Sequence, residues 1–144
     1  MTKTLPDKWI RKAVYNAINN TVVNTFAIPC FDTRVPMNDK RNFYVIMSTQ
    51  SNEVDKSVKC GYRWESQILL DVITSYDING NTGSRLMADD ILNSIKTLTD
   101  NLTLDISSGL EIITQSQSFP SDLVSTTKNE IVYRKLMRIE FLIN

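Results

Sequence analysis

Two long stretches of alternating apolar and polar residues, 62–76 and 129–143, constrain the fold of this chain more than any other feature. In the first stretch the apolar residues of one face are Tyr62, Trp64, Ile68, Leu70 and Val72. In the second stretch they are Ile131, Tyr133, Met137, Ile139 and Phe141. Alternation with period two is typical of a strand with one buried face, and both stretches exceed the usual strand length of about 5–6 residues. The sequence therefore predicts two long strands.

Apolar residues spaced three to four positions apart predict two helices. The first is expected to begin at Leu5-Pro6-Asp7, because Pro and Asp both suit a first helical turn, and to stop near residues 19–21. Its apolar stripe consists of Ile10, Val14, Ala17 and Ile18. The second is expected from residue 84 to about 101, with a stripe formed by Met87, Ile91, Ile95, Leu98 and Leu102.

Three further segments have the composition of strands. Residues 26–31 form a short apolar run in which Pro29 indicates an edge or a strand end. Residues 43–49 are apolar on both sides, which predicts a strand covered on both faces, and the polar residues 50–61 after them are expected to form a loop. Residues 110–119 alternate weakly, and residues 119–122 around Pro120 are expected to end that strand.

The order of these elements predicts an α+β fold. We expect one domain over residues 1–144, a sandwich of a mostly antiparallel β-sheet packed with two α-helices in the order α-β-β-β-α-β-β. The length agrees, because 144 residues are enough for one domain to bury a core without a disulfide or a metal.

The composition argues against catalysis. The chain has 16 Lys and Arg, 16 Asp and Glu, and no His, so zinc sites, Ser-His-Asp triads and Cys-His dyads cannot be built from it alone. A net charge of zero is not the broad basic field expected of a protein that binds nucleic acid or an anionic membrane. We expect no enzyme activity, no cofactor and no metal.

Several other features bear on location. Residues 1–12 are polar and charged, so no signal peptide is expected, and no apolar run approaches the ~20 residues of a membrane span. Cys30 and Cys60 are expected to be free thiols, as in a reducing compartment.

Local motifs that could bind a ligand have simpler interpretations. The turn at 80–85 contains Gly80 and Gly83 but lacks the spacing and the Lys of a phosphate-binding loop. Asp89 and Asp90 are adjacent in the second helix, so their side chains diverge by about 100° and are expected to be solvated rather than to bind a metal.

Charged residues gather on the polar sides of the two long strands. They are Arg63, Glu65, Asp71, Arg134, Arg138 and Glu140. Glu65 and Asp71 lie on one face but roughly 20 Å apart along an extended chain, too far for paired-carboxylate hydrolysis. If the two strands are neighbours, these residues form one surface of mixed charge. That surface is either solvated or a self-association surface, in which complementary charge sets register and partner.

The sequence also resembles a known family. Residues 28–36, Ile-Pro-Cys-Phe-Asp-Thr-Arg-Val-Pro, followed by Phe-Tyr-Val-Ile-Met at 43–47, resemble the front of the tail terminator, or tail completion, proteins of tailed bacteriophages. The resemblance continues through Trp64 at the start of a long strand, the turn at 80–83 with the helix after it, and the closing strand at 133–141. It covers nearly the whole chain through structural motifs, while residues 50–59 and 102–109 depart from it.

The resemblance implies a structural virion protein of the phage neck. Such proteins form a ring that terminates the tail tube and joins the tail to the head connector, usually as a hexamer, with a ring of twelve as an alternative. The implied partners are further copies of the chain, tail-tube proteins and head-connector or portal-side proteins. No membrane and no sequence-specific nucleic acid is implied, although DNA can pass through the ring. The implied location is the neck or tail of the virion, after synthesis in the host cytoplasm.

Two alternatives remain open at this point. One is another head–tail connector or adaptor ring protein. The other is a small ligand-binding domain or enzyme that uses Asp71, Glu65 or the Gly80–Gly83 turn, which would require a deep pocket with convergent polar groups. For the ring, the expected interface residues are Asp32, Arg34, Pro36, Lys56, Lys59, Glu65, Asp71, Arg134 and Arg138.

Overall fold

The computed structural model describes residues 4–36, 42–55, 63–80, 83 and 85–144. Its elements are α1 (Asp7–Ile18), β1 (Thr21–Val23), β2 (Phe26–Ile28), β3 (Cys30–Asp32), β4 (Phe43–Val54), β5 (Trp64–Asp77), α2 (Leu86–Leu98), the short 3₁₀ helix η1 (Ile106–Ser108), β6 (Ile112–Thr126) and β7 (Glu130–Ile143). The predicted α+β fold is confirmed.

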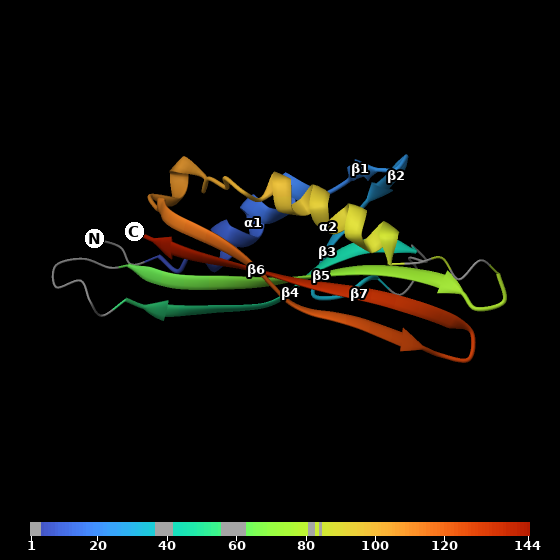
Figure 1. Ribbon diagram of the computed structural model, residues 1–144. Coiled ribbons are helices and arrows are strands. Elements are labelled where there is room, and N and C mark those ends of the chain that lie inside the picture. The colour runs from blue at the N-terminus through green and yellow to red at the C-terminus, as the bar shows by residue number, and fades with distance from the viewer. Residues whose placement is uncertain (1–3, 37–41, 56–62, 81–82, 84) are drawn as a thin grey trace.

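One five-stranded sheet organises the molecule (Figure 1). Its strand order is β3-β4-β5-β7-β6, and every neighbouring pair is antiparallel except β3 with β4. The strands β1 and β2 form a separate small hairpin. Both helices lie on the same face of the large sheet, with α1 against β4 and α2 against β5 and β7.

The hydrophobic core fills the space between the helices and this face. The helices contribute residues that include Ile10, Val14, Ile91 and Ile95, all at most 1% exposed. The long strands contribute Ile68, Leu70, Val72, Met137 and Ile139, also at most 1% exposed. The predicted alternation identifies the core face of β5 and β7, and the predicted stripes identify that of the helices, except that Leu98 is 42% exposed and Leu102, although buried, lies beyond the end of α2.

The strand β4 is longer than predicted. The sequence indicates a loop from residue 50, but β4 continues to Val54. A β-bulge between Met47 and Gln50 shifts the register, and the polar residues beyond it pair with β5. The side chain of Gln50 donates to the backbone oxygen of Asp7 at 2.9 Å, so the start of α1 satisfies this polar side chain of β4.

The strand β6 also continues past its predicted end. Pro120 was expected to break it, yet β6 runs to Thr126 through a register shift between Ser118 and Ser121. Proline is tolerated here because β6 is an edge strand and the shift removes one ladder position.

The predicted strand at 26–31 is wrong in detail, because the chain divides at Pro29 between two sheets. Before the proline, β2 pairs with β1 in the hairpin; after it, β3 joins the large sheet beside β4. The prediction that both sides of β4 are covered is also wrong. Val45 and Met47 are buried under the helices, whereas Tyr44 and Ile46 are half-exposed on the opposite face.

Candidate functional site: the open face of the sheet

The face of the large sheet that points away from α1 and α2 is the candidate functional site, and we call it the open face (Figure 1). Its members alternate with the core residues along each strand. On the two central strands they are Glu65, Gln67, Leu69, Asp71 and Ile73 of β5, and Arg134, Leu136, Arg138 and Glu140 of β7. The predicted surface of mixed charge therefore exists, because β5 and β7 are direct neighbours.

At one end of the open face Asp71 and Arg134 form an ion pair. The Arg134 Nη2 atom lies 2.5 Å and its Nε atom 3.1 Å from Asp71 Oδ2. The Asp71 side chain is only 8% exposed, whereas that of Arg134 is 41% exposed. The hydrogen bond that Arg134 donates to Asp71 raises the pKa of Arg134. Two of the predicted interface residues thus pair with each other inside one chain, and Arg134 still presents its outer edge to solvent.

Tyr44 lies on the same face, and Asp71 and Arg134 both affect the pKa of its hydroxyl. Burial raises the pKa of its hydroxyl, and the negative charges of Glu130 and Asp71 raise it further. Its ring packs edge-on against Phe31 with 6.1 Å between centroids. The open face therefore combines aromatic and aliphatic surface with an arginine, residue types that are enriched in protein–protein contacts.

At the other end the open face is polar and hollowed. A groove of about 790 Å³ is lined by residues that include Ser51, Glu65, Gln67, Ser116 and Glu140. This groove lies along the sheet, between the outer half of β4 and the first half of β6. In the described part of the chain no three Asp, Glu or Cys side chains gather as a metal site would need.

The remaining predicted interface residues lie elsewhere or are not described. Asp32 ends β3 and forms an ion pair of 3.6 Å with Arg11, each side chain about half-exposed. Arg34 and Pro36 follow it and are exposed. This group lies at the β3 edge of the sheet, apart from Arg134 and Arg138. Lys56 and Lys59 lie outside the described residues, as does part of the Gly80–Gly83 turn.

Sequence reasoning missed a charge network on the helix side of the sheet. Lys135 of β7 forms ion pairs with Asp89 of α2 and, at 3.4 Å, with Asp122 of β6. The hydrogen bond to Asp89 is the main reason why the pKa of Lys135 is raised. Asp90 instead accepts a hydrogen bond of 2.7 Å from Asn24. The two adjacent acids therefore point to different partners, as their helical geometry predicts.

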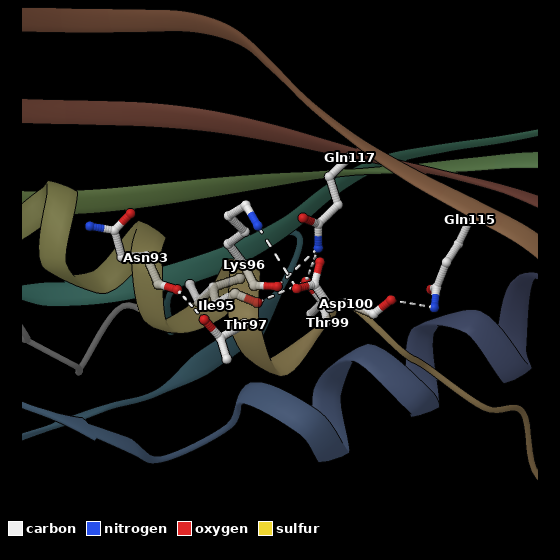
Figure 2. A network of polar contacts seen from close by, with 8 residues as sticks. All are labelled: Asn93, Ile95, Lys96, Thr97, Thr99, Asp100, Gln115 and Gln117. Carbon is white, nitrogen blue, oxygen red and sulfur yellow. Dashed lines mark hydrogen bonds and ion pairs between the residues drawn. The ribbon is translucent and has the colours of Figure 1, made fainter.

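Sequence reasoning also missed the contacts between β6 and the end of α2 (Figure 2). The amide of Gln117 donates to the backbone oxygen of Lys96 and to Thr99 Oγ1, both at 3.0 Å. The amide of Gln115 donates to the backbone oxygen of Asp100 at 2.7 Å. Gln117 thus satisfies a carbonyl group that the last turn of a helix leaves without a partner, and Gln115 satisfies a carbonyl group just beyond the end of α2. The sequence signal that could have indicated these contacts was the spacing of Gln115 and Gln117, because residues two apart in a strand point to the same face.

The described residues contain no helix that is long and apolar enough to cross a bilayer.

Comparison with known proteins adds a likeness in fold. No family model matches the chain, and no curated protein matches its sequence. A chain in a solved structure described as "Virion of native gene transfer agent (GTA) particle" has a similar fold, with a TM-score of 0.60 and 16% sequence identity. The alignment covers 94% of this chain and 96% of the other. The two chains thus share their fold over nearly their whole lengths.

Proposed function

We propose that this chain is a structural protein of a phage-like virion. The observation that carries the proposal is the fold it shares, over 94% of its length, with a chain of a gene transfer agent virion. Because a fold alone does not determine a function, the candidate site must also be compatible with a structural role in a virion. The open face is compatible, since it offers a wide surface of apolar and charged side chains.

Within the virion we propose the role of tail terminator in the neck. This finer proposal rests on the sequence resemblance at residues 28–36, 43–47 and 133–141. The chain would form a ring, as a hexamer first and a dodecamer second, between the tail tube and the head connector. It would work through binding surfaces alone, with no catalysis and no cofactor.

A ring requires two different surfaces on each subunit, because each copy contacts the next through a heterologous interface. The open face supplies one such surface, with Arg134, Arg138, Glu65 and Asp71. The exposed segment with Asp32, Arg34 and Pro36 supplies a second, at the β3 edge of the sheet. We also propose Lys56 and Lys59 as interface residues, and this part of the proposal rests on the sequence alone.

Two measurements test the proposal at different levels. Mass spectrometry of purified particles should find the chain at a few copies per particle, in the ratio of a single ring to the major capsid protein. Mass photometry of the purified protein, with and without tail tubes, should find an assembly of six or twelve copies. Particles that lack the chain would refute the virion role, whereas particles that contain it in hundreds of copies would refute the neck ring.

A further inference from the structure

The strand β6 presents a free edge along its 15 residues. It is the last strand of the large sheet, paired on one side with β7. In the part of the chain that the structure describes, no backbone hydrogen bond joins the outer edge of β6 to another element. A row of unpaired N–H and C=O groups is a template for pairing with a further strand.

The first half of this edge lacks the features that normally prevent such pairing. Edge strands are commonly protected by Lys, by Pro or by a bulge. In β6, Pro120 and the shift between Ser118 and Ser121 protect only the second half, and the single charged residue, Asp122, lies there too. Residues 112–118 are uncharged and regular except near Ile112, where the pairing with β7 also shifts.

A second free edge lies on the opposite side of the same sheet. The strand β3 covers only Val45, Ile46 and Met47 of β4. Residues 48 and 49 of β4 lie in the bulge, residues 50–54 pair with β5 on their inner side, and no described strand lies on the outer side of this segment. This half of β4 is rich in Ser, Thr, Gln and Asn, with Glu53 as its only charge, so its composition matches residues 112–118.

The two free edges lie at the same level of the sheet. Ser51 of β4 is opposite Gln67 of β5, Gln67 is opposite Glu140 of β7, and Glu140 is opposite Ser116 of β6. One row of side chains on the open face therefore runs from one free edge to the other.

The directions of the edges decide which partner fits. The four strands β4, β5, β7 and β6 are antiparallel in succession, so β4 and β6 run in opposite directions. A second copy placed beside β6 in the same orientation would present its β4 antiparallel to β6. Antiparallel ladders are slightly more stable per residue than parallel ones. The two edges are thus complementary in a head-to-tail contact, and such a contact closes into a ring when each copy is also rotated relative to the one before it.

We infer that residues 112–118 of β6 in one subunit pair antiparallel with residues 48–54 of β4 in the next, so that the sheets of neighbouring subunits join edge to edge. This inference rests on the proposed ring and specifies its subunit contact. The backbone hydrogen bonds supply the pairing, and the row through Ser51 and Ser116 continues across the boundary on the open face.

Paired cysteines test this contact. The double variant Ser51→Cys with Ser116→Cys, made in a Cys60→Ser background, is oxidised with copper-phenanthroline and run on a non-reducing gel. Within one chain the two positions are three strand spacings apart, about 14 Å, which is too far for a disulfide. Each chain would therefore bond to a neighbour on both sides, and the expected result is a ladder of three or more chains.

The single variants are the matched controls. Ser51→Cys alone and Ser116→Cys alone carry one engineered thiol each, so they and a mixture of the two can form products of at most two chains through these thiols. A double variant that stops at two chains, or that gives no ladder, overturns the inference. The latter result is also expected if β6 instead pairs with a different virion protein. The virion role is tested separately by the composition of the particles. A failure of the proposed strand pairing therefore does not imply a failure of the proposed virion role.

Discussion

At the scale of single residues, Asp71 and Arg134 show how the open face combines stability with an accessible charge. The carboxylate is almost enclosed, whereas the guanidinium reaches solvent. Removing the two partners therefore leaves different defects. A buried carboxylate without a partner is costly, but an arginine that can turn to water is not.

We predict unequal effects for the two truncations. Arg134→Met should lower the free energy of unfolding by about 2–4 kcal/mol, because it leaves the carboxylate of Asp71 buried and unpaired. Asp71→Asn should lower it by about 1 kcal/mol. Urea denaturation followed by circular dichroism measures both, and the double variant Asp71→Leu with Arg134→Met should be more stable than Arg134→Met alone. Equal losses for the two single variants would contradict this description of the pair.

The thiol of Cys30 permits a second prediction at this scale. Burial, with a smaller effect of Asp32, raises the pKa of Cys30 to about 12. The thiolate is the reactive form, and at pH 8 only about one thiol in ten thousand would be ionised. Cys30 should therefore resist iodoacetamide in the native protein and react in urea, as measured by mass spectrometry of its peptide. Equally fast labelling in both states would show that the thiol is accessible.

At the scale of elements, the sequence predicts each long strand and both helices, because their apolar spacing follows from which face is buried. It fails where the pattern is polar. The outer half of β4 and the end of β6 have no apolar alternation, and their pairing depends on the neighbouring strand rather than on their own residues. The charge of the open face was predicted, but the pairing of Asp71 with Arg134 depended on a register that one sequence cannot give.

The contact between β6 and α2 yields a prediction about elements. Gln117→Ala removes the hydrogen bonds to the carbonyl of Lys96 and to the buried hydroxyl of Thr99. We expect a loss of about 1–2 kcal/mol in the free energy of unfolding. The neighbouring exposed position gives the control: Ser118→Ala should change it by less than about 0.5 kcal/mol. Thermal unfolding of the three proteins in parallel decides, and identical midpoints would show that the amide does not hold β6 to the helix.

At the scale of the whole molecule, both helices cover one face of the sheet and leave the other free. A monomer of this kind has an uncovered sheet face, and it also has unpaired backbone groups along the two free edges of the sheet. Neutral net charge fits this arrangement, since charges of both signs occur on the open face. Assembly into a ring would pair the two edges, with the charged side chains of the open face contributing to the contact between subunits.

Charge reversal on the open face tests whether that face takes part in assembly. Arg138→Glu should raise the concentration needed for half-assembly by about tenfold, equivalent to about 1.4 kcal/mol, because it places a negative charge beside Glu140 on the proposed contact surface. Lys128→Glu, in the turn between β6 and β7, changes the net charge equally and should leave assembly unchanged. Sedimentation measures assembly, and circular dichroism confirms folding. Unchanged assembly of Arg138→Glu would remove this residue from the interface.

The most direct test of the central claim, that this chain is a ring subunit of a phage-like neck, is a cryo-electron microscopy map of purified particles. The account predicts density for this fold in a closed ring at the head end of the tail tube, with six or twelve copies. A map that resolves the whole neck without this fold, or that places the fold elsewhere in the particle, would contradict it.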